Sequence, residues 1–213
     1  MKKKSPPPKK NPLAKKKKTK TPAATSTATS YQIKVTLHHV RPPVWRRLIV
    51  PPDITLGLLH SVILDAMGWS GGHLHDFADG MACYGPADDD PFGFGDDDDV
   101  IDESTVKLSS ILRNPKDWFD HRYDFGDGWE HRIVLEKVVP ATPIQPILCT
   151  AGKRACPPED CGGPWGYQNF LEALADPKHD EHEEMSEWIG GDFDPEHFDL
   201  ERTNQLLSSN RPK

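Results

Sequence analysis

The sequence contains no run of about 18 apolar residues, the length that a helix needs to cross a membrane. We therefore expect no membrane-spanning segment. No apolar stretch follows the basic N-terminus, so we also expect no secretory signal peptide. Cysteine is scarce, with four residues among 213. Few cysteines without an export signal are typical of a reducing compartment, and we expect a cytoplasmic protein without disulfides.

Residues 1–30 lack carboxylates, aromatic residues and β-branched aliphatic residues, and they hold ten of the 26 basic residues of the chain. Such a segment cannot bury enough apolar surface to offset its ordering entropy, so we expect a disordered, lysine-rich tail. Its charge predicts non-specific binding to nucleic acid. A solubilising arm, or an arm that folds loosely onto the acidic body, fits the same composition. The lysines expected to contact phosphate are Lys15, Lys16, Lys17, Lys18 and Lys20.

The rest of the chain is acidic, because 16 basic and 33 acidic residues give it a net charge of −17. It is long enough to bury a full core, and we expect a single domain over residues 31–208. An aspartate-rich stretch at about 86–103 predicts an acidic, solvated loop. The glycine and acidic positions of a calcium-binding helix–loop–helix are not present in it.

The start of this body predicts a β-hairpin and a helix. Apolar residues alternate over 31–37, which indicates a half-buried strand, and residues 44–50 follow a proline turn as the return strand. Thr55 is suited to begin a helix as its N-cap, and Gly68 is suited to end it.

Further along, the dipeptide at 127–128, Asp-Gly, predicts the tight turn of a second antiparallel hairpin. Helices are expected in the C-terminal part: one ends at 176–177, a second starts there and runs toward 188, and a third starts at 194–195. Because strands come mostly first and helices last, we expect an α+β fold with the C-terminal helices packed on the sheet.

Five titratable residues are candidates for a catalytic or metal-binding site. His73 and His75 would share one face of a strand if Leu74 lies in it. Asp124, Asp127 and His131 are expected to cluster near the second hairpin turn. Carboxylates beside histidine can carry out general acid–base chemistry or bind a metal ion. If all five converge in one pocket, a metal-dependent hydrolase is one hypothesis; the other is that they are hydrogen-bonded structural residues.

Three cysteines, Cys149, Cys156 and Cys161, are spaced C-x6-C-x4-C. The paired C-x2-C of zinc ribbons and of thioredoxin-like redox sites is absent. A zinc ion would need a fourth ligand, for which His179 and His182 are candidates. The proline-rich segment CPPEDCGGP predicts a rigid loop in which cysteines pack as small apolar residues. Zinc binding and a reactive thiol stay open as alternatives, and the expectation is no cofactor.

The motifs together resemble one family. They are YQIKVTL, PPVWRR, DITL, GWSGGHLHDF, YDFGDGWEH, GKRACPPEDCGGPWGY and GGDFDPEHFD. This set is similar to the plasmid pRiA4b ORF-3-like family, whose relatives include an insertion-sequence passenger protein labelled TnpR. The resemblance implies an α+β domain carried on plasmids, mobile elements and chromosomes, without established catalytic residues. We therefore expect a non-enzymatic binding or accessory module that contacts nucleic acid or a protein partner.

Overall fold

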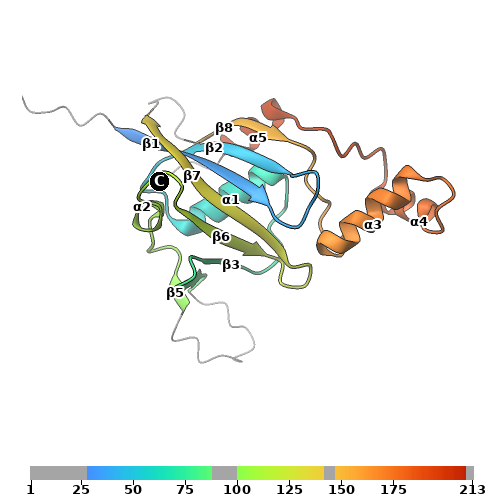
Figure 1. Ribbon diagram of the computed structural model, residues 1–213, viewed down its shortest axis with the longest axis horizontal. Coiled ribbons are helices and arrows are strands. Elements are labelled where there is room, and N and C mark those ends of the chain that lie inside the picture. The colour runs from blue at the N-terminus through green and yellow to red at the C-terminus, as the bar shows by residue number, and fades with distance from the viewer. Residues whose placement is uncertain (1–27, 88–99, 142–146, 210–213) are drawn as a thin grey trace, which may run out of the picture.

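The computed structural model describes residues 28–87, 100–141 and 147–209. These residues form one eight-stranded sheet with the order β5-β4-β3-β6-β7-β1-β2-β8, accompanied by five helices (Figure 1). The strands are β1 Thr29–Leu37, β2 Trp45–Val50, β3 His75–Ala78, β4 Cys83–Gly85, β5 Val100–Asp102, β6 Trp118–Tyr123, β7 Trp129–Pro140 and β8 Leu148–Lys153. The helices are α1 Leu56–Met67, α2 Leu108–Ile111, α3 Gly163–Ala175, α4 His182–Ile189 and α5 Leu200–Leu207.

The sheet is antiparallel except where β4 runs parallel to β5, and three of the five helices, α3, α4 and α5, follow the last strand. The predicted α+β fold is confirmed. No helix in the described part of the chain is long and apolar enough to cross a membrane.

Most of the predicted tail, including its five candidate lysines, lies outside the described residues. The sheet begins slightly earlier than expected, because β1 starts at Thr29. Thr29 and Ser30 pair with Pro140 and Val139 at the end of the long strand β7. The length of β7, which the sequence did not predict, gives these two residues a partner strand.

The predicted N-terminal hairpin is present. β1 and β2 pair antiparallel from Tyr31 opposite Val50 to Thr36 opposite Trp45. Alternate side chains of β1 face the core, and Ile33 among them is fully buried. The period of two in the sequence therefore identified the buried face of this strand.

The helix predicted after the hairpin is α1. The Thr55 hydroxyl accepts a hydrogen bond from a first-turn backbone N–H, and Gly68 ends the helix in the left-handed conformation with φ 98°. Ile63 on its apolar face is fully buried. Arg46 of β2 donates a 2.8 Å hydrogen bond to the Ala66 carbonyl oxygen, which ties the last turn of α1 to the sheet behind which it lies in Figure 1.

The second hairpin joins β6 to β7, but its connection is five residues long, 124–128. Of the predicted pair 127–128, only Gly128 has a positive φ angle (68°). The other positive φ angle in this turn is at Asp124 (53°). One carboxylate oxygen of Asp124 accepts the backbone N–H groups of Gly126 and Asp127, and these bonds stabilise the longer turn.

Part of the predicted acidic loop is regular structure. Residues 88–99 lie outside the described residues, whereas Val100–Asp102 forms β5 beside β4. Glu103, expected to be solvated, is only 7% exposed. It faces inward because the His75 Nε2 lies 3.1 Å from its carboxylate.

Helix α3 follows the prediction, but the next two helices start later than predicted, at His182 and Leu200. The Asp-Pro pairs form local turns instead, because the carboxylates of Asp176 and Asp194 each accept the backbone N–H two residues later. Helix α5 packs against β8 and α1, whereas α3 and α4 pack against each other at one end of the molecule (Figure 1).

Candidate functional site

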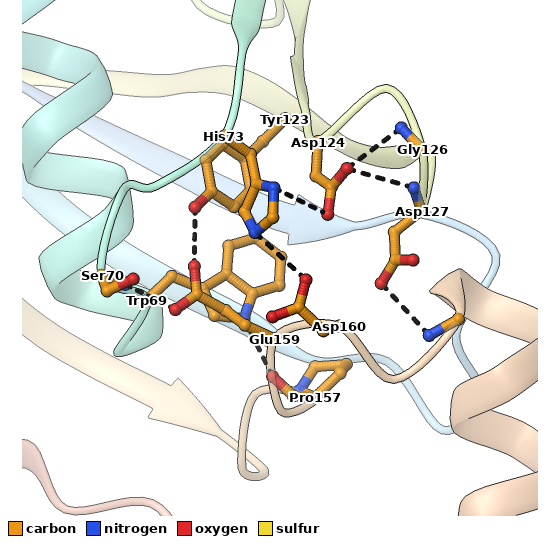
Figure 2. Close-up of polar contacts among 11 residues, drawn as sticks. Trp69, Ser70, His73, Tyr123, Asp124, Gly126, Asp127, Pro157, Glu159 and Asp160 are labelled. Atoms are coloured by element: carbon orange, nitrogen blue, oxygen red, sulfur yellow. Dashed lines mark hydrogen bonds and ion pairs between the residues drawn. The ribbon is translucent and has the colours of Figure 1, made fainter.

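Three loops that are far apart in the sequence meet beside the sheet (Figure 2). They are residues 69–73 after α1, residues 124–128 between β6 and β7, and residues 156–163 between β8 and the first turn of α3. We call this arrangement the three-loop junction. Polar side chains from all three loops point toward one another there, which makes it the best candidate for a functional site.

Hydrogen bonds between loops hold the junction together. The Trp69 indole N–H donates to the Pro157 carbonyl oxygen at 2.9 Å, and the Ser70 backbone N–H donates to the Glu159 carboxylate at 3.0 Å. The Tyr123 hydroxyl donates to the second carboxylate oxygen of Glu159 at 2.6 Å. Burial works against ionisation of Glu159, but these hydrogen bonds outweigh it and lower the pKa of this carboxyl. The first and third loops are therefore joined through a carboxylate.

His73 lies between two further carboxylates. Its Nδ1 is 3.5 Å from Asp124 Oδ2, and its Nε2 is 3.3 Å from Asp160 Oδ1. The Asp124 side chain is 12% exposed and that of Asp160 is 71% exposed. The ring of Tyr123 meets the imidazole edge-on, with centroids 5.7 Å apart, which helps to orient it. Each of the three loops thus contributes one of the three side chains.

The other carboxylate of the β6–β7 turn, Asp127, contacts the third loop and not His73. Its Oδ2 accepts the Gly162 backbone N–H at 3.2 Å. Gly163 approaches the Asp127 carbonyl so closely that a Cβ atom would lie 2.1 Å from the oxygen. Asp127 therefore joins the hairpin turn to the start of α3.

The other two predicted histidines lie elsewhere. Strand β3 begins only at His75, so His73 precedes the strand. The His75 ring stacks on His60 with centroids 3.3 Å apart, and the His60 Nδ1 is 3.0 Å from the His121 Nε2. The His121 Nδ1 is in turn 3.3 Å from the His131 Nδ1. We call these four residues the histidine chain; the five predicted site residues are divided between it and the junction.

Three members of the histidine chain, His60, His121 and His131, resist protonation. His121 and His131 have no exposed surface. Burial is the main cause that lowers the pKa of His60 and of His131 to about 3, and that of His121 well below its ordinary value. The Nε2 of His131 has no hydrogen-bond partner among the described residues.

Sequence reasoning missed four residues of these two groups. Glu159 and Asp160 lie between Cys156 and Cys161. Only the thiols of this stretch were considered as ligands, so its two carboxylates were overlooked. His121 lies two residues before Tyr123 on the buried face of β6, so its period-two position was a usable signal. Nothing local marks His60, because only the packing of α1 on the sheet brings it to His121.

The cysteines of the predicted loop are free thiols. Burial raises the pKa of Cys149, of Cys156 and of Cys161, the last to about 12. A nucleophile or a zinc ligand must be a thiolate, so burial disfavours both roles relative to the structural one. His179 Nδ1 accepts the Glu181 backbone N–H, which engages one nitrogen of a candidate fourth ligand locally.

Two groups of side chains in the described part of the chain bring three potential metal ligands within 4.8 Å of one another, and neither includes a cysteine. One is the junction group of His73, Asp124 and Asp160. The second comprises His38, His39 and Glu130 near the β1–β2 turn.

A groove of about 900 Å³ lies beside the junction. It is lined by the end of β1 with the turn that follows, by the β6–β7 turn, and by the first turns of α3. Asp127 and Gly128 belong both to the lining and to the three-loop junction, so the two sites share a wall. Trp165, also in the lining, is 88% exposed.

Comparisons with known proteins agree with the motifs. The family model described as plasmid pRiA4b ORF-3-like protein matches residues 29–202. An uncharacterized protein, y4hQ, from Sinorhizobium fredii is 42% identical over 182 residues, which cover 84% of this chain and 91% of that protein. The crystal structure of MM3350 from Methanosarcina mazei, a protein of unknown function, has a TM-score of 0.74 and 37% identity over 82% of this chain and 96% of that chain.

Proposed function

The chain belongs to the plasmid pRiA4b ORF-3-like family, and on that premise we propose that its folded body is a non-enzymatic binding module. Its ligand is an extended segment of a partner protein, which occupies the groove beside the three-loop junction. The relatives named above carry no stated activity, so the proposal depends on the groove itself.

The exposure of Trp165 is the observation that carries this proposal. Its side chain stands 88% exposed at the groove, which leaves most of a large apolar ring in water. Tryptophan is enriched among the residues that dominate binding energy at protein interfaces. Pro43 and Pro164 also line the groove, and aromatic grooves of this kind bind extended, proline-rich segments.

The charges of the groove favour a peptide over nucleic acid. Arg41 and Asp127 both line it, so the lining offers a donor and an acceptor of opposite charge. A phosphate backbone requires a basic surface, whereas residues 31–213 have a net charge of −17. A polypeptide main chain, which carries both N–H and C=O groups, suits a lining of mixed polarity.

The test uses peptides selected from a phage-displayed random library on the full-length protein. These peptides are expected to bind Trp165→Ala at least about tenfold more weakly than the wild type, because truncating an interface tryptophan costs about 2 kcal/mol of binding free energy. Fluorescence anisotropy of the labelled peptides measures the change. Trp118→Ala is the matched control, since Trp118 is 48% exposed and lies at the end of β6 remote from the turn. Equal affinity for Trp165→Ala and the wild type would contradict the proposal.

The lysine-rich tail is the second binding element that we propose, because ten lysines without a carboxylate attract phosphate. Replacing its five candidate lysines by glutamine is expected to reduce the slope of log affinity for duplex DNA against log salt by about 4, at about 0.9 per phosphate contact. The five are Lys15, Lys16, Lys17, Lys18 and Lys20. Titrations on two unrelated duplexes test this, and an unchanged slope or a preference for one duplex would overturn it.

The hydrolase hypothesis is less well supported. Of its five residues, His73, Asp124 and Asp127 lie at the junction, whereas His75 and His131 belong to the histidine chain.

All four cysteines are free thiols, which supports a reducing cytoplasm as the place of action. The description of the family model refers to a plasmid, which supports the proposal of an accessory role on a mobile element.

A further inference from the structure

We propose that His73, Asp124 and Asp160 form a binding site for one divalent transition-metal ion, with zinc as the best match. The site goes beyond the peptide groove and does not depend on it. It also differs from the zinc site considered for the cysteine loop, because its ligands are one imidazole and two carboxylates. Zinc accepts nitrogen and oxygen donors of these types.

The three donors already lie close together. One ligand atom from each residue falls within 4.8 Å of the other two. The 3.3 Å between His73 Nε2 and Asp160 Oδ1 matches the separation of about 3.3 Å between two ligands of a tetrahedral zinc ion with bonds of about 2.0 Å, whereas Asp124 Oδ2 faces the other ring nitrogen, Nδ1, at 3.5 Å. Because an ion binds only one imidazole nitrogen, the side chains of His73 and Asp124 must adjust so that this nitrogen faces both carboxylates.

Asp124 is held in position to act as a ligand. Its Oδ1 accepts the backbone N–H groups of Gly126 at 3.0 Å and Asp127 at 3.2 Å, while its Oδ2 faces His73. Outer hydrogen bonds of this kind orient the ligands of protein metal sites. One oxygen is thus used to fix the turn, and the other is directed toward the proposed ion.

His73 is oriented as well. Tyr123 packs edge-on against its ring, and the Tyr123 hydroxyl is itself fixed by Glu159. Figure 2 shows the imidazole between the carboxylates of Asp124 and Asp160.

The remaining coordination positions open to solvent, because the Asp160 side chain is 71% exposed. Three protein ligands leave room for water or for a group of an incoming ligand. The charge also favours a cation, because two of the three ligands are carboxylates.

The test is titration of chelator-treated, full-length protein with Zn²⁺ by calorimetry and with Co²⁺ by visible absorbance. One ion per chain is expected. Asp160→Asn and His73→Gln are each expected to weaken binding at least about tenfold, the effect that loss of even an outer-shell partner produces. Asp124→Asn, which keeps an oxygen for the turn amides, should do the same.

His39→Gln is the matched control, because His39 belongs to the second, more exposed group with Glu130. It should bind zinc as the wild type does, and so should Trp165→Ala. Asp160→Asn alters an exposed side chain, so an unchanged thermal unfolding curve shows that the variant is folded. Wild-type protein without saturable binding, unaltered binding by Asp160→Asn and His73→Gln, or a sulfur-to-cobalt charge-transfer band would each overturn the site.

Discussion

Lowering the pH from 7 to 5 is expected to reduce the free energy of unfolding by about 4 to 6 kcal/mol, since three imidazoles of the histidine chain resist protonation in the folded protein. Burial lowers the pKa of His60 and of His131 to about 3, and that of His121 well below its ordinary value. An imidazole in the unfolded chain titrates near 6.5. Between these values the unfolded chain binds more protons, so stability is fully present above pH 6.5 and falls as the pH drops toward 3.

The size of the effect depends on how many of the three rings stay neutral at pH 5 in the folded protein. Each imidazole contributes about 2 kcal/mol over these two pH units, at about 1.4 kcal/mol per pKa unit below 6.5. The free energy of unfolding of a domain is about 5–15 kcal/mol, so three such groups remove a large part of it. A carboxylate next to the rings would oppose the shift, but Glu103 contacts only the outermost ring, that of His75.

Urea unfolding at pH 7, 6 and 5 measures the loss. His131→Phe should flatten the dependence on pH by about one third, because one of three titrating rings is removed. The change also removes the contact of His131 Nδ1 with His121 Nδ1, so the slopes against pH are compared and not the absolute stabilities. His197→Gln is the control, since His197 is exposed, and its profile should match the wild type. A profile that is flat between pH 7 and 5, or one that His131→Phe leaves unchanged, would contradict neutral His60, His121 and His131 in the folded protein.

The parts of the fold that the sequence predicted are those specified by neighbouring residues. Alternation in β1, the Thr55 cap and the left-handed Gly68 are local features, and each is found as expected. The Asp-Pro pair at 176–177 was also read as a helix start, but the same chemistry stabilises a short turn when the Asp176 carboxylate accepts a nearby backbone N–H. Local signals therefore mark the ends of elements better than they distinguish a helix from a turn.

The junction shows why the site was harder to predict. Asp124 and His73 were recognised from motifs, but Asp160 meets His73 only because the loop after β8 reaches the loop before β3. Likewise, His75 was grouped with His73 by sequence spacing, whereas the start of β3 separates the two and pairs His75 with His60. Contacts across long sequence separations depend on strand order, which residue spacing does not encode.

The close contact between Gly163 and Asp127, which joins two of these loops, can be tested by adding a single Cβ atom at Gly163. Gly163→Ala is expected to reduce the free energy of unfolding by about 3–5 kcal/mol, because the new Cβ would lie 2.1 Å from the Asp127 carbonyl oxygen. This neighbour is backbone in a turn fixed by Asp124, so it cannot rotate away as a side chain would. To accommodate the new Cβ atom, the β6–β7 turn and the start of α3 must move apart. Urea unfolding of the variant and the wild type measures the cost.

Gly190→Ala separates the steric contact from backbone strain. Gly190 has the same φ of 68° as Gly163, but no atom lies within 4 Å of its Cβ position. The left-handed conformation alone costs an alanine about 1–2 kcal/mol, so Gly190→Ala should lose only this amount. Because Gly163 holds together the wall that the groove and the junction share, its variant should also lose peptide and zinc binding, whereas Gly190→Ala should keep both. Equal stability losses in the two variants would show that the close approach of α3 to the β6–β7 turn contributes nothing to the fold.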